Sequence, residues 1–196
     1  MKPENPIPLP RSYIPQHLRM EVKTLLIGEW QIAHRVQELA HQIEEDFRDK
    51  DLIVVSLLNG TIIFLADLIR QIGMPMHLDF IGVSSYGNST ESRELVYTKD
   101  LRLDVKGRDV LLVDDILDTG RTLKDVTLKL EKLQPRTIRS CVLLDKPDRR
   151  SEEVRADYVG FEVPDFFVVG YGLDYAERYR NLPFIGVLKP EIYQDT

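Results

Sequence analysis

The 196-residue sequence contains one cysteine, Cys141, so no internal disulfide can form, and we expect a buried structural thiol. It contains no run of about eighteen apolar residues and no apolar signal segment near the N-terminus, which argues against a membrane protein or a secreted one. Acidic residues outnumber basic ones by 32 to 26, so the basic excess typical of nucleic-acid scaffolds is missing. We therefore expect a cytoplasmic protein whose partners include neither membrane nor nucleic acid.

Two common phosphate-binding signatures are also missing. The chain has no Walker-type Gly-x-x-x-x-Gly-Lys-Ser/Thr, and no Gly-x-Gly-x-x-Gly follows a strand. It has no internal repeat and no low-complexity tract. Its hydrophobic content of 43% and charged content of 30% are typical of a globular domain, and its length is sufficient for one domain with a sizeable core.

Proline is concentrated at the start of the chain. It occupies five of the first fifteen positions, namely Pro3, Pro6, Pro8, Pro10 and Pro15. This spacing is incompatible with a helix and favours an extended arm. We therefore divide the chain into a Pro-rich extended arm over residues 1–19 and one domain over residues 20–196.

The rest of the chain alternates between short apolar runs and amphipathic segments. Helices are predicted at 31–47 and 61–72 and after residue 120, and strands at 52–58, 76–83, 110–113, 138–144, 158–161 and 166–170. This alternation predicts an α/β fold with a mostly parallel, twisted sheet flanked by helices. The polar stretch 84–100 is long for a loop, and loops of this length are often active-site lids or hairpins.

The segment from Val110 to Leu123 is the most informative part of the sequence. Its four leading apolar residues, 110–113, are typical of a strand buried on both faces. Three carboxylates follow within five positions, and a small polar turn then opens a helix. The apolar residues of that helix lie three or four positions apart and predict one buried face: Leu123, Val126, Leu130 and Leu133. Ligands of open α/β sheets bind beyond the carboxyl ends of the strands, where these polar residues would lie.

The chemistry of this segment suits a sugar phosphate. At a helix N-terminus the polar turn presents backbone N–H groups, hydroxyls and a cation to a phosphate, from Thr119, Gly120, Arg121 and Thr122. Asp114 and Asp115, at the strand end, can accept hydrogen bonds from vicinal hydroxyls or hold a hydrated Mg²⁺. The alternative is an ordinary acidic loop with a helix N-cap, but a cap needs only one such residue.

These residues resemble the phosphoribosyl-pyrophosphate-binding motif of the type I phosphoribosyltransferases. Further matches, from about Val22 to the C-terminus, resemble the hypoxanthine (hypoxanthine-guanine) phosphoribosyltransferase family. The resemblance implies the type I phosphoribosyltransferase fold with a small hood built from the chain termini, a Mg²⁺ cofactor, and a homodimer or homotetramer. The implied reaction transfers the 5-phosphoribosyl group from phosphoribosyl pyrophosphate to hypoxanthine or guanine, giving IMP or GMP plus pyrophosphate.

The resemblance also implies roles for the residues of the central motif. Asp114 and Asp115 would hold the ribose hydroxyls and the metal, and residues 119–122 would hold the 5′-phosphate. Asp118 would be the catalytic base that handles the purine N7 proton. The polar stretch 84–100 would be a mobile flap, with Ser85 and Tyr86 in its motif.

A second loop, Asn59-Gly60-Thr61, follows a buried strand and opens a helix. The residues alone leave open whether it is a plain glycine turn or an anion-binding loop. By resemblance, Asn59 and Gly60 hold pyrophosphate oxygens and the Leu58–Asn59 peptide can be cis, although most relatives have lysine where this chain has Asn59. Arg180 would face the pyrophosphate, and Asp174 would bind Mg²⁺.

The resemblance assigns purine recognition to three residues near the end of the chain. Lys146 would donate to the purine O6, Phe167 would stack on the purine face, and Val168 would read the base edge through its backbone. Without the resemblance, Lys146 would be a solvated lysine and Phe167 a core aromatic.

The neighbouring charged pair has no role in this interpretation. We expect Arg149 and Arg150 to be surface charges.

Two alternative functions remain open at this point. A xanthine-preferring phosphoribosyltransferase would fit the same residues, since Lys146 disfavours only a 6-amino purine. A nucleotide-sensing regulator of the same fold would be expected to show a basic face or an added helix-turn-helix, and this acidic chain shows neither.

Overall fold

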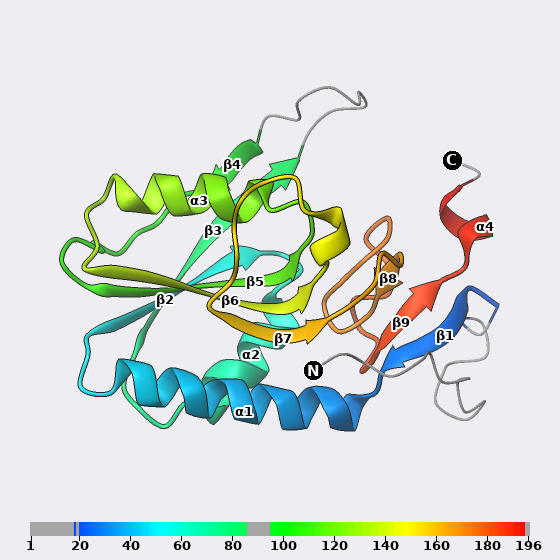
Figure 1. Cartoon of the computed structure of the whole chain (residues 1–196), viewed down its shortest axis with the longest axis horizontal. Helices are drawn as coiled ribbons and strands as arrows, with labels where there is room; N and C mark the ends of the chain where they lie inside the picture. The colour runs from blue at the N-terminus through cyan, green and yellow to red at the C-terminus, as the bar shows by residue number, and fades with distance from the viewer. Residues whose placement is uncertain (1–17, 19, 86–94, 195–196) are drawn as a thin grey trace.

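The computed structural model of the chain describes residues 18, 20–85 and 95–194 (Figure 1). Their elements, in chain order, are β1 (Val22–Ile27), α1 (Glu29–Phe47), β2 (Leu52–Leu58), α2 (Ile62–Gln71), β3 (His77–Ser85), β4 (Leu95–Lys99), β5 (Asp109–Leu117), α3 (Arg121–Glu131), β6 (Thr137–Asp145), a 3₁₀ turn (Pro147–Arg149), β7 (Tyr158–Glu162), β8 (Val168–Val169), β9 (Ile185–Leu188) and α4 (Pro190–Tyr193). None of the helices in the described parts of the chain is both long and apolar enough to cross a membrane.

The main body is a six-stranded sheet in the order β4-β3-β2-β5-β6-β7. All neighbouring strands pair in parallel except β3 and β4, which are antiparallel. Helices α1 and α2 cover one face and α3 covers the other (Figure 1). The predicted mostly parallel sheet flanked by helices is therefore confirmed, and β2 and β5 lie at its centre, where both faces are covered.

The hood predicted from the chain termini is a second, three-stranded sheet in the order β1-β9-β8. Its strands pair antiparallel, so the start of the described chain lies beside its end (Figure 1). Strands β1 and β9 were not among the predicted strands, and neither was β4, which lies within the predicted loop 84–100. Residues 1–17 and 19, most of the predicted arm, lie outside the described residues, and Leu18 is buried in the apolar cluster of the hood.

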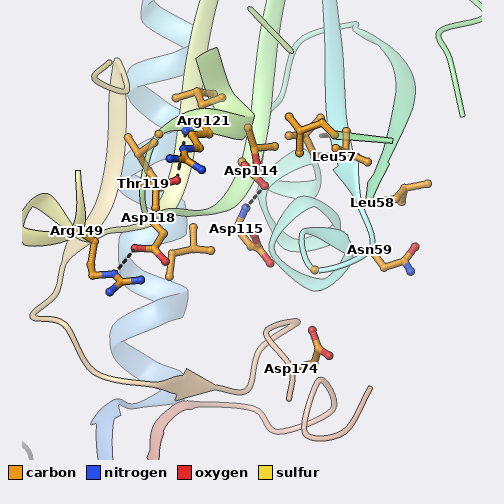
Figure 2. Close-up of a pocket in the computed structure, with 18 of the residues that line it drawn as sticks. Leu57, Leu58, Asn59, Asp114, Asp115, Asp118, Thr119, Arg121, Arg149 and Asp174 are labelled. Carbon is orange, nitrogen blue, oxygen red and sulfur yellow. Dashed lines mark hydrogen bonds and ion pairs between the residues drawn. The ribbon is translucent and has the colours of Figure 1, made fainter. Parts of the chain in front are cut away.

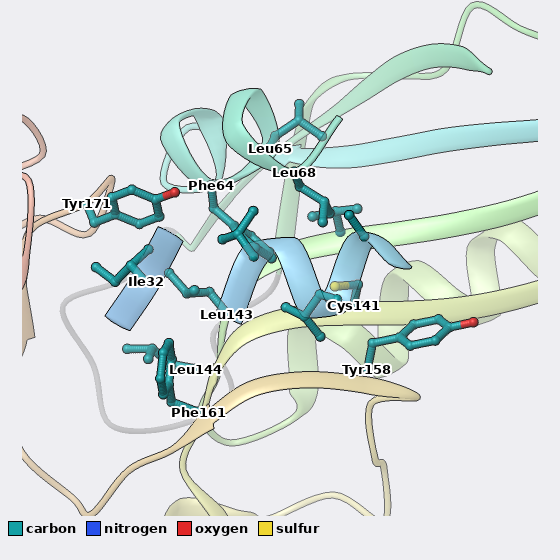
Figure 3. Close-up of a cluster of buried hydrophobic side chains, with 14 of the residues drawn as sticks. Ile32, Phe64, Leu65, Leu68, Cys141, Leu143, Leu144, Tyr158, Phe161 and Tyr171 are labelled. Atoms are coloured by element: carbon teal, nitrogen blue, oxygen red, sulfur yellow. The ribbon is translucent and has the colours of Figure 1, made fainter. Parts of the chain in front are cut away.

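The core lies on both faces of the main sheet. On the α1 and α2 face, the buried side of α1 packs with Phe64, Leu68 and the buried side chains of β6 and β7 (Figure 3). Cys141 is fully buried in this cluster, as predicted, and burial raises the pKa of its thiol. On the other face, α3 contributes Leu123, Val126 and Leu130.

The prediction that Leu133 belongs to the core is wrong. Leu133 lies beyond the end of α3, in a turn where its N–H donates to the carbonyl of Leu130 at 2.9 Å. Its side chain is 43% exposed because the chain leaves the helical path before that position. In the sequence, apolar residues keep the helical spacing as far as Leu133, although the helix itself ends at Glu131.

The other departures concern segment lengths. Within the predicted loop 84–100, β3 continues to Ser85 and pairs antiparallel with β4, so the ends of this segment form a hairpin. Residues 86–94, including Tyr86 of the predicted flap, lie outside the described residues. The predicted strand 166–170 is reduced to the two residues of β8.

Candidate active site

A cleft of about 680 Å³ lies where β2 and β5 end, and the loop between β8 and β9 of the hood faces these strand ends (Figure 2). The loops that follow these two parallel strands meet at one edge of the sheet, which is the usual ligand position in this kind of fold. Among the predicted site residues, those that line the cleft are Asn59, Gly60, Asp114, Asp115, Asp118, Thr119, Gly120, Arg121, Thr122, Asp174 and Arg180. Segments far apart in the sequence thus contribute to one site.

Asp114 and Asp115 form the acidic wall of the cleft, at the end of β5. Asp114 is almost fully buried, and its Oδ1 accepts a hydrogen bond from the backbone N–H of Asp115 at 3.0 Å. Burial raises the pKa of Asp114, and the neighbouring charge of Asp115 raises it further. Burial also raises the pKa of Asp115, partly opposed by hydrogen bonding with Asp114 and by the charge of Arg180. Two carboxylates held this close together favour a positively charged or hydrogen-donating ligand.

The polar turn after β5 has the geometry expected of an anion site. Gly120 has φ +89°, in the left-handed region that favours glycine, and a Cβ there would lie 2.5 Å from Cγ1 of Val154. The back of the turn is fixed because the N–H groups of Ser151 and Glu152 donate to the Thr119 carbonyl at 3.0 and 3.2 Å. Helix α3 then begins at Arg121, so its positive N-terminal end faces the cleft.

The loop after β2 packs directly against the acidic wall. The Leu58–Asn59 peptide is cis, as the resemblance implied. Gly60 leaves space for Asp115, because a Cβ at that position would lie 2.8 Å from the Asp115 carboxyl carbon and closer still to Oδ2. Helix α2 begins just beyond, with the Leu65 N–H donating to the Thr61 carbonyl at 2.8 Å. This loop is therefore in direct contact with the acidic wall and leads straight into α2.

The hood contributes an ion pair to the same cleft. Arg180 Nη2 lies 2.9 Å from Asp174 Oδ1, and its Nη1 donates to the Gly172 carbonyl at 2.8 Å. The second oxygen of Asp174 accepts from the Glu177 N–H at 3.0 Å. Asp174 projects from the loop across the cleft from the ends of β2 and β5 (Figure 2). The residues predicted to bind pyrophosphate and metal thus share the cleft with the acidic wall.

The three residues predicted to bind purine lie beside the cleft rather than in its lining. Lys146 is 7% exposed, and its Nζ donates to the Phe166 carbonyl at 2.7 Å, so the solvated-lysine interpretation is wrong. Burial lowers the pKa of Lys146, partly offset by the charges of Asp118 and Asp165.

The Phe167 ring is half-buried among aromatic neighbours. It stacks on Tyr193, with centroids 4.4 Å apart, and meets Tyr175 edge-on at 5.5 Å. Its carbonyl accepts from the Leu188 N–H at 2.8 Å, which joins this segment to β9. Val168 follows in β8 and is buried.

The sequence interpretation missed the arginines that follow β6. Arg150 is not a surface charge: it donates to the carbonyls of Leu117 and Asp118 and pairs with Asp145. Arg149 lines the cleft, and its Nε lies 3.3 Å from Asp118 Oδ1 (Figure 2). A signal was present, because both arginines lie within five residues of the carboxyl end of β6, and ligand sites form at the carboxyl ends of parallel strands.

Comparisons with known proteins agree with this geometry. The model of the phosphoribosyl transferase domain matches residues 27–176. A hypoxanthine-guanine phosphoribosyltransferase of Bacillus subtilis is 46% identical over 178 residues, covering 90% of this chain and 99% of that protein. The crystal structure of a hypoxanthine phosphoribosyltransferase from Staphylococcus aureus is 44% identical, with a TM-score of 0.88, covering 92% of this chain and 98% of that one. The chain therefore belongs to the phosphoribosyltransferase family, and it is an enzyme.

Proposed function

We propose that this enzyme acts in purine salvage, transferring the 5-phosphoribosyl group from phosphoribosyl pyrophosphate to hypoxanthine or guanine to give IMP or GMP plus pyrophosphate. The observation that carries the proposal is that three features meet in one cleft. They are the carboxylates at the end of β5, the helix N-terminus at residues 119–122, which suits a phosphate, and the glycine loop Asn59-Gly60 after β2. A phosphoribosyl pyrophosphate molecule needs partners for vicinal hydroxyls, for a 5′-phosphate and for a pyrophosphate, and these features supply all three.

The sugar phosphate would be held by the residues of β5 and the turn after it. Residues 119–122 would bind the 5′-phosphate, and Asp114 and Asp115 would accept hydrogen bonds from the ribose hydroxyls. Asn59 and Gly60 would bind the pyrophosphate with Arg180 opposite them. Since Asn59 carries no charge, the cation on this side of the leaving group would come from Arg180.

The same cleft suits Mg²⁺. No group of three or more metal-ligating side chains is preassembled among the described residues. Mg²⁺ is usually bound by one or two carboxylates together with substrate phosphates and water, which fits Asp114, Asp115 and Asp174, since all three line the cleft. When bound, Mg²⁺ would neutralise the departing pyrophosphate.

The purine would be bound at the side of the cleft nearest Lys146. The Lys146 ammonium would donate to O6, Phe167 would stack on the purine face, and Val168 would meet the base edge with its backbone. Asp118, which lines the cleft and lies 3.3 Å from Arg149, would accept the N7 proton as N9 attacks C1′. Ser85, the last residue of β3, would begin the flap that excludes water during transfer.

We further propose that the enzyme is cytoplasmic and forms a homodimer or homotetramer. Sedimentation equilibrium of the purified full-length chain tests the assembly, and a monomer at micromolar concentration would contradict it.

A panel of purines tests the proposed substrates. Purified enzyme with phosphoribosyl pyrophosphate and Mg²⁺ is supplied separately with hypoxanthine, guanine, xanthine and adenine, and nucleotide formation is measured. We expect fast turnover with hypoxanthine or guanine and very slow turnover with adenine, because Lys146 can donate but cannot accept. Faster turnover of xanthine than of both would establish the xanthine-preferring alternative, and turnover of none would contradict the proposal.

A further inference from the structure

Four charged side chains of alternating sign lie in a row beside the proposed purine position. Arg149 Nε lies 3.3 Å from Asp118 Oδ1 and 3.7 Å from Asp165 Oδ1. The same Asp165 oxygen lies 3.9 Å from Lys146 Nζ. The row therefore runs from Asp118 through Arg149 and Asp165 to Lys146.

The four side chains come from three separate segments. Asp118 follows β5, Lys146 and Arg149 follow β6, and Asp165 precedes β8 of the hood. Lys146 is fixed a second time, because its Nζ donates to the carbonyl of Phe166, the residue directly before Phe167. The row thus connects the edge of the main sheet to the hood segment that carries the proposed stacking ring.

The Lys146 end of the row is buried, whereas the other three side chains, including Asp118 at 38% exposed, reach solvent. The Lys146 side chain is 8% exposed, whereas those of Arg149 and Asp165 are 48% and 52% exposed. A half-exposed ion pair contributes little to folding free energy because water screens it. Arg149 and Asp165 are therefore weak candidates for a purely stabilising role.

We propose that Arg149 and Asp165 are positioning residues, forming an ionic bridge that holds the carboxylate of Asp118 and the ammonium of Lys146 at the spacing set by N7 and O6 of a 6-oxopurine. This inference rests on the proposed function, since it assumes that Asp118 and Lys146 meet the purine. N7 and O6 lie on the same edge of the base, so one rigid spacing serves both contacts. Preorganised groups bind more tightly because less freedom is lost on binding.

The charged groups near Lys146 predict how its pKa should change when either member of the bridge is removed. Burial lowers the pKa of Lys146, Asp118 and Asp165 raise it, and Arg149 lowers it. Among the described residues, these three side chains are the charged groups that shift the pKa of Lys146. Removing Asp165 should therefore lower the pKa of Lys146, and removing Arg149 should raise it.

Kinetics of three variants test the bridge: Arg149→Gln, Asp165→Asn and the double variant. Each single change should raise the KM for hypoxanthine by about 2- to 5-fold, the range expected for a half-exposed ion pair, with the KM for phosphoribosyl pyrophosphate unchanged. The double variant should resemble the worse single variant, because both changes break one bridge. Asp148→Asn, in the same 3₁₀ turn, and Arg155→Gln are matched controls at exposed positions, and neither should change either KM.

A second readout does not depend on catalysis. The titration of Lys146 is followed by heteronuclear NMR of the lysine side chains, with its signal assigned from Lys146→Ala. The pKa should fall in Asp165→Asn and rise in Arg149→Gln, relative to the two controls.

Fully additive kinetic effects, or a Lys146 pKa that does not move in opposite directions, would overturn the bridge. A purely structural role would instead lower the thermal midpoint of both variants without this pKa pattern. Failure of the bridge can be distinguished from failure of the proposed function. If Lys146→Ala raises the hypoxanthine KM while the bridge variants do not, the function stands and the bridge fails. If the natural enzyme makes no nucleotide from any purine, the proposed function itself fails.

Discussion

Gly60 offers a sharp test of how the pyrophosphate loop and the acidic wall fit together. Its backbone is outside the left-handed region, so alanine can adopt the same conformation and the added methyl group is the only change. That methyl carbon would lie 2.8 Å from the Asp115 carboxyl carbon, well inside normal contact, and Asp115 would have to move. Overpacking of this kind costs about 1–3 kcal/mol.

Gly60→Ala should impair substrate binding as well as stability. Asp115 is the proposed partner of ribose hydroxyls and metal, and a hydrogen bond to a charged group contributes about 1.5–3 kcal/mol. Losing one such contact corresponds to a rise of about 10- to 100-fold in the KM for phosphoribosyl pyrophosphate, since 1.4 kcal/mol is roughly tenfold. The hypoxanthine KM should change little, because the purine residues lie beside the cleft.

Steady-state kinetics with both substrates varied, together with thermal unfolding, provide the assay. Gly28→Ala is the matched control, because a Cβ there meets only Gln31 and Leu25, at 3.4 and 3.8 Å. A Gly60→Ala enzyme with an unchanged KM for phosphoribosyl pyrophosphate would refute the proposed packing of the loop against Asp115. Equal rises in both KM values would also refute it, since they would indicate a general distortion.

Three further predictions concern single side chains. Asp118→Asn should keep sugar-phosphate binding but lower kcat by roughly 10²–10⁴-fold, the usual contribution of a general base, and unchanged turnover across neutral pH would remove Asp118 from that role. Lys146→Ala should raise the KM for hypoxanthine and guanine, because the purine O6 loses its donor, and should have much less effect on the KM for phosphoribosyl pyrophosphate. Unchanged KM values for the purines would show that the buried amine is only structural. Asp79 in β3 should make the fold acid-sensitive. Burial alone would raise the pKa of Asp79, but backbone N–H donors, including those of Leu103 and Arg102, and the Lys99 ammonium hold this pKa at about 2. Because the folded pKa is depressed, about 2 kcal/mol of stability is present above pH 4 and is lost as the pH falls from about 4 to 2. Urea unfolding across that range should show a smaller loss in Asp79→Asn than in the natural protein, and equal losses would contradict the prediction.

The sequence predicted the sheet and most of the cleft because these depend on local patterns. Val110–Val113 is apolar throughout since β5 is buried on both faces, and the carboxylates after it occupy the strand end where ligands bind. The apolar face of α3 is also a local property, and the structure buries three of the four residues that helical spacing selected, namely Leu123, Val126 and Leu130. In these segments, local pattern and tertiary environment agree.

The parts that the sequence did not predict depend on contacts between distant segments. Strand β1 forms because β9, more than 150 residues later, supplies its only strand partner in the described hood sheet. The position of Arg150 depends on the carbonyls of Leu117 and Asp118 at the end of β5, and no local pattern shows that they lie within reach. The fit of Gly60 against Asp115 is likewise a contact across 55 positions of the chain. Such contacts can be read only from coordinates or carried over from a related protein.

The most direct test of the proposed reaction follows the fate of the leaving group. The enzyme is incubated with Mg²⁺ and phosphoribosyl pyrophosphate radiolabelled in its pyrophosphate group, with and without hypoxanthine, and the products are separated by chromatography. Transfer to the purine predicts IMP and labelled pyrophosphate in equal amounts, with little label released when hypoxanthine is omitted. Release of label at the same rate without purine, or release without IMP, would contradict the proposed phosphoribosyl transfer.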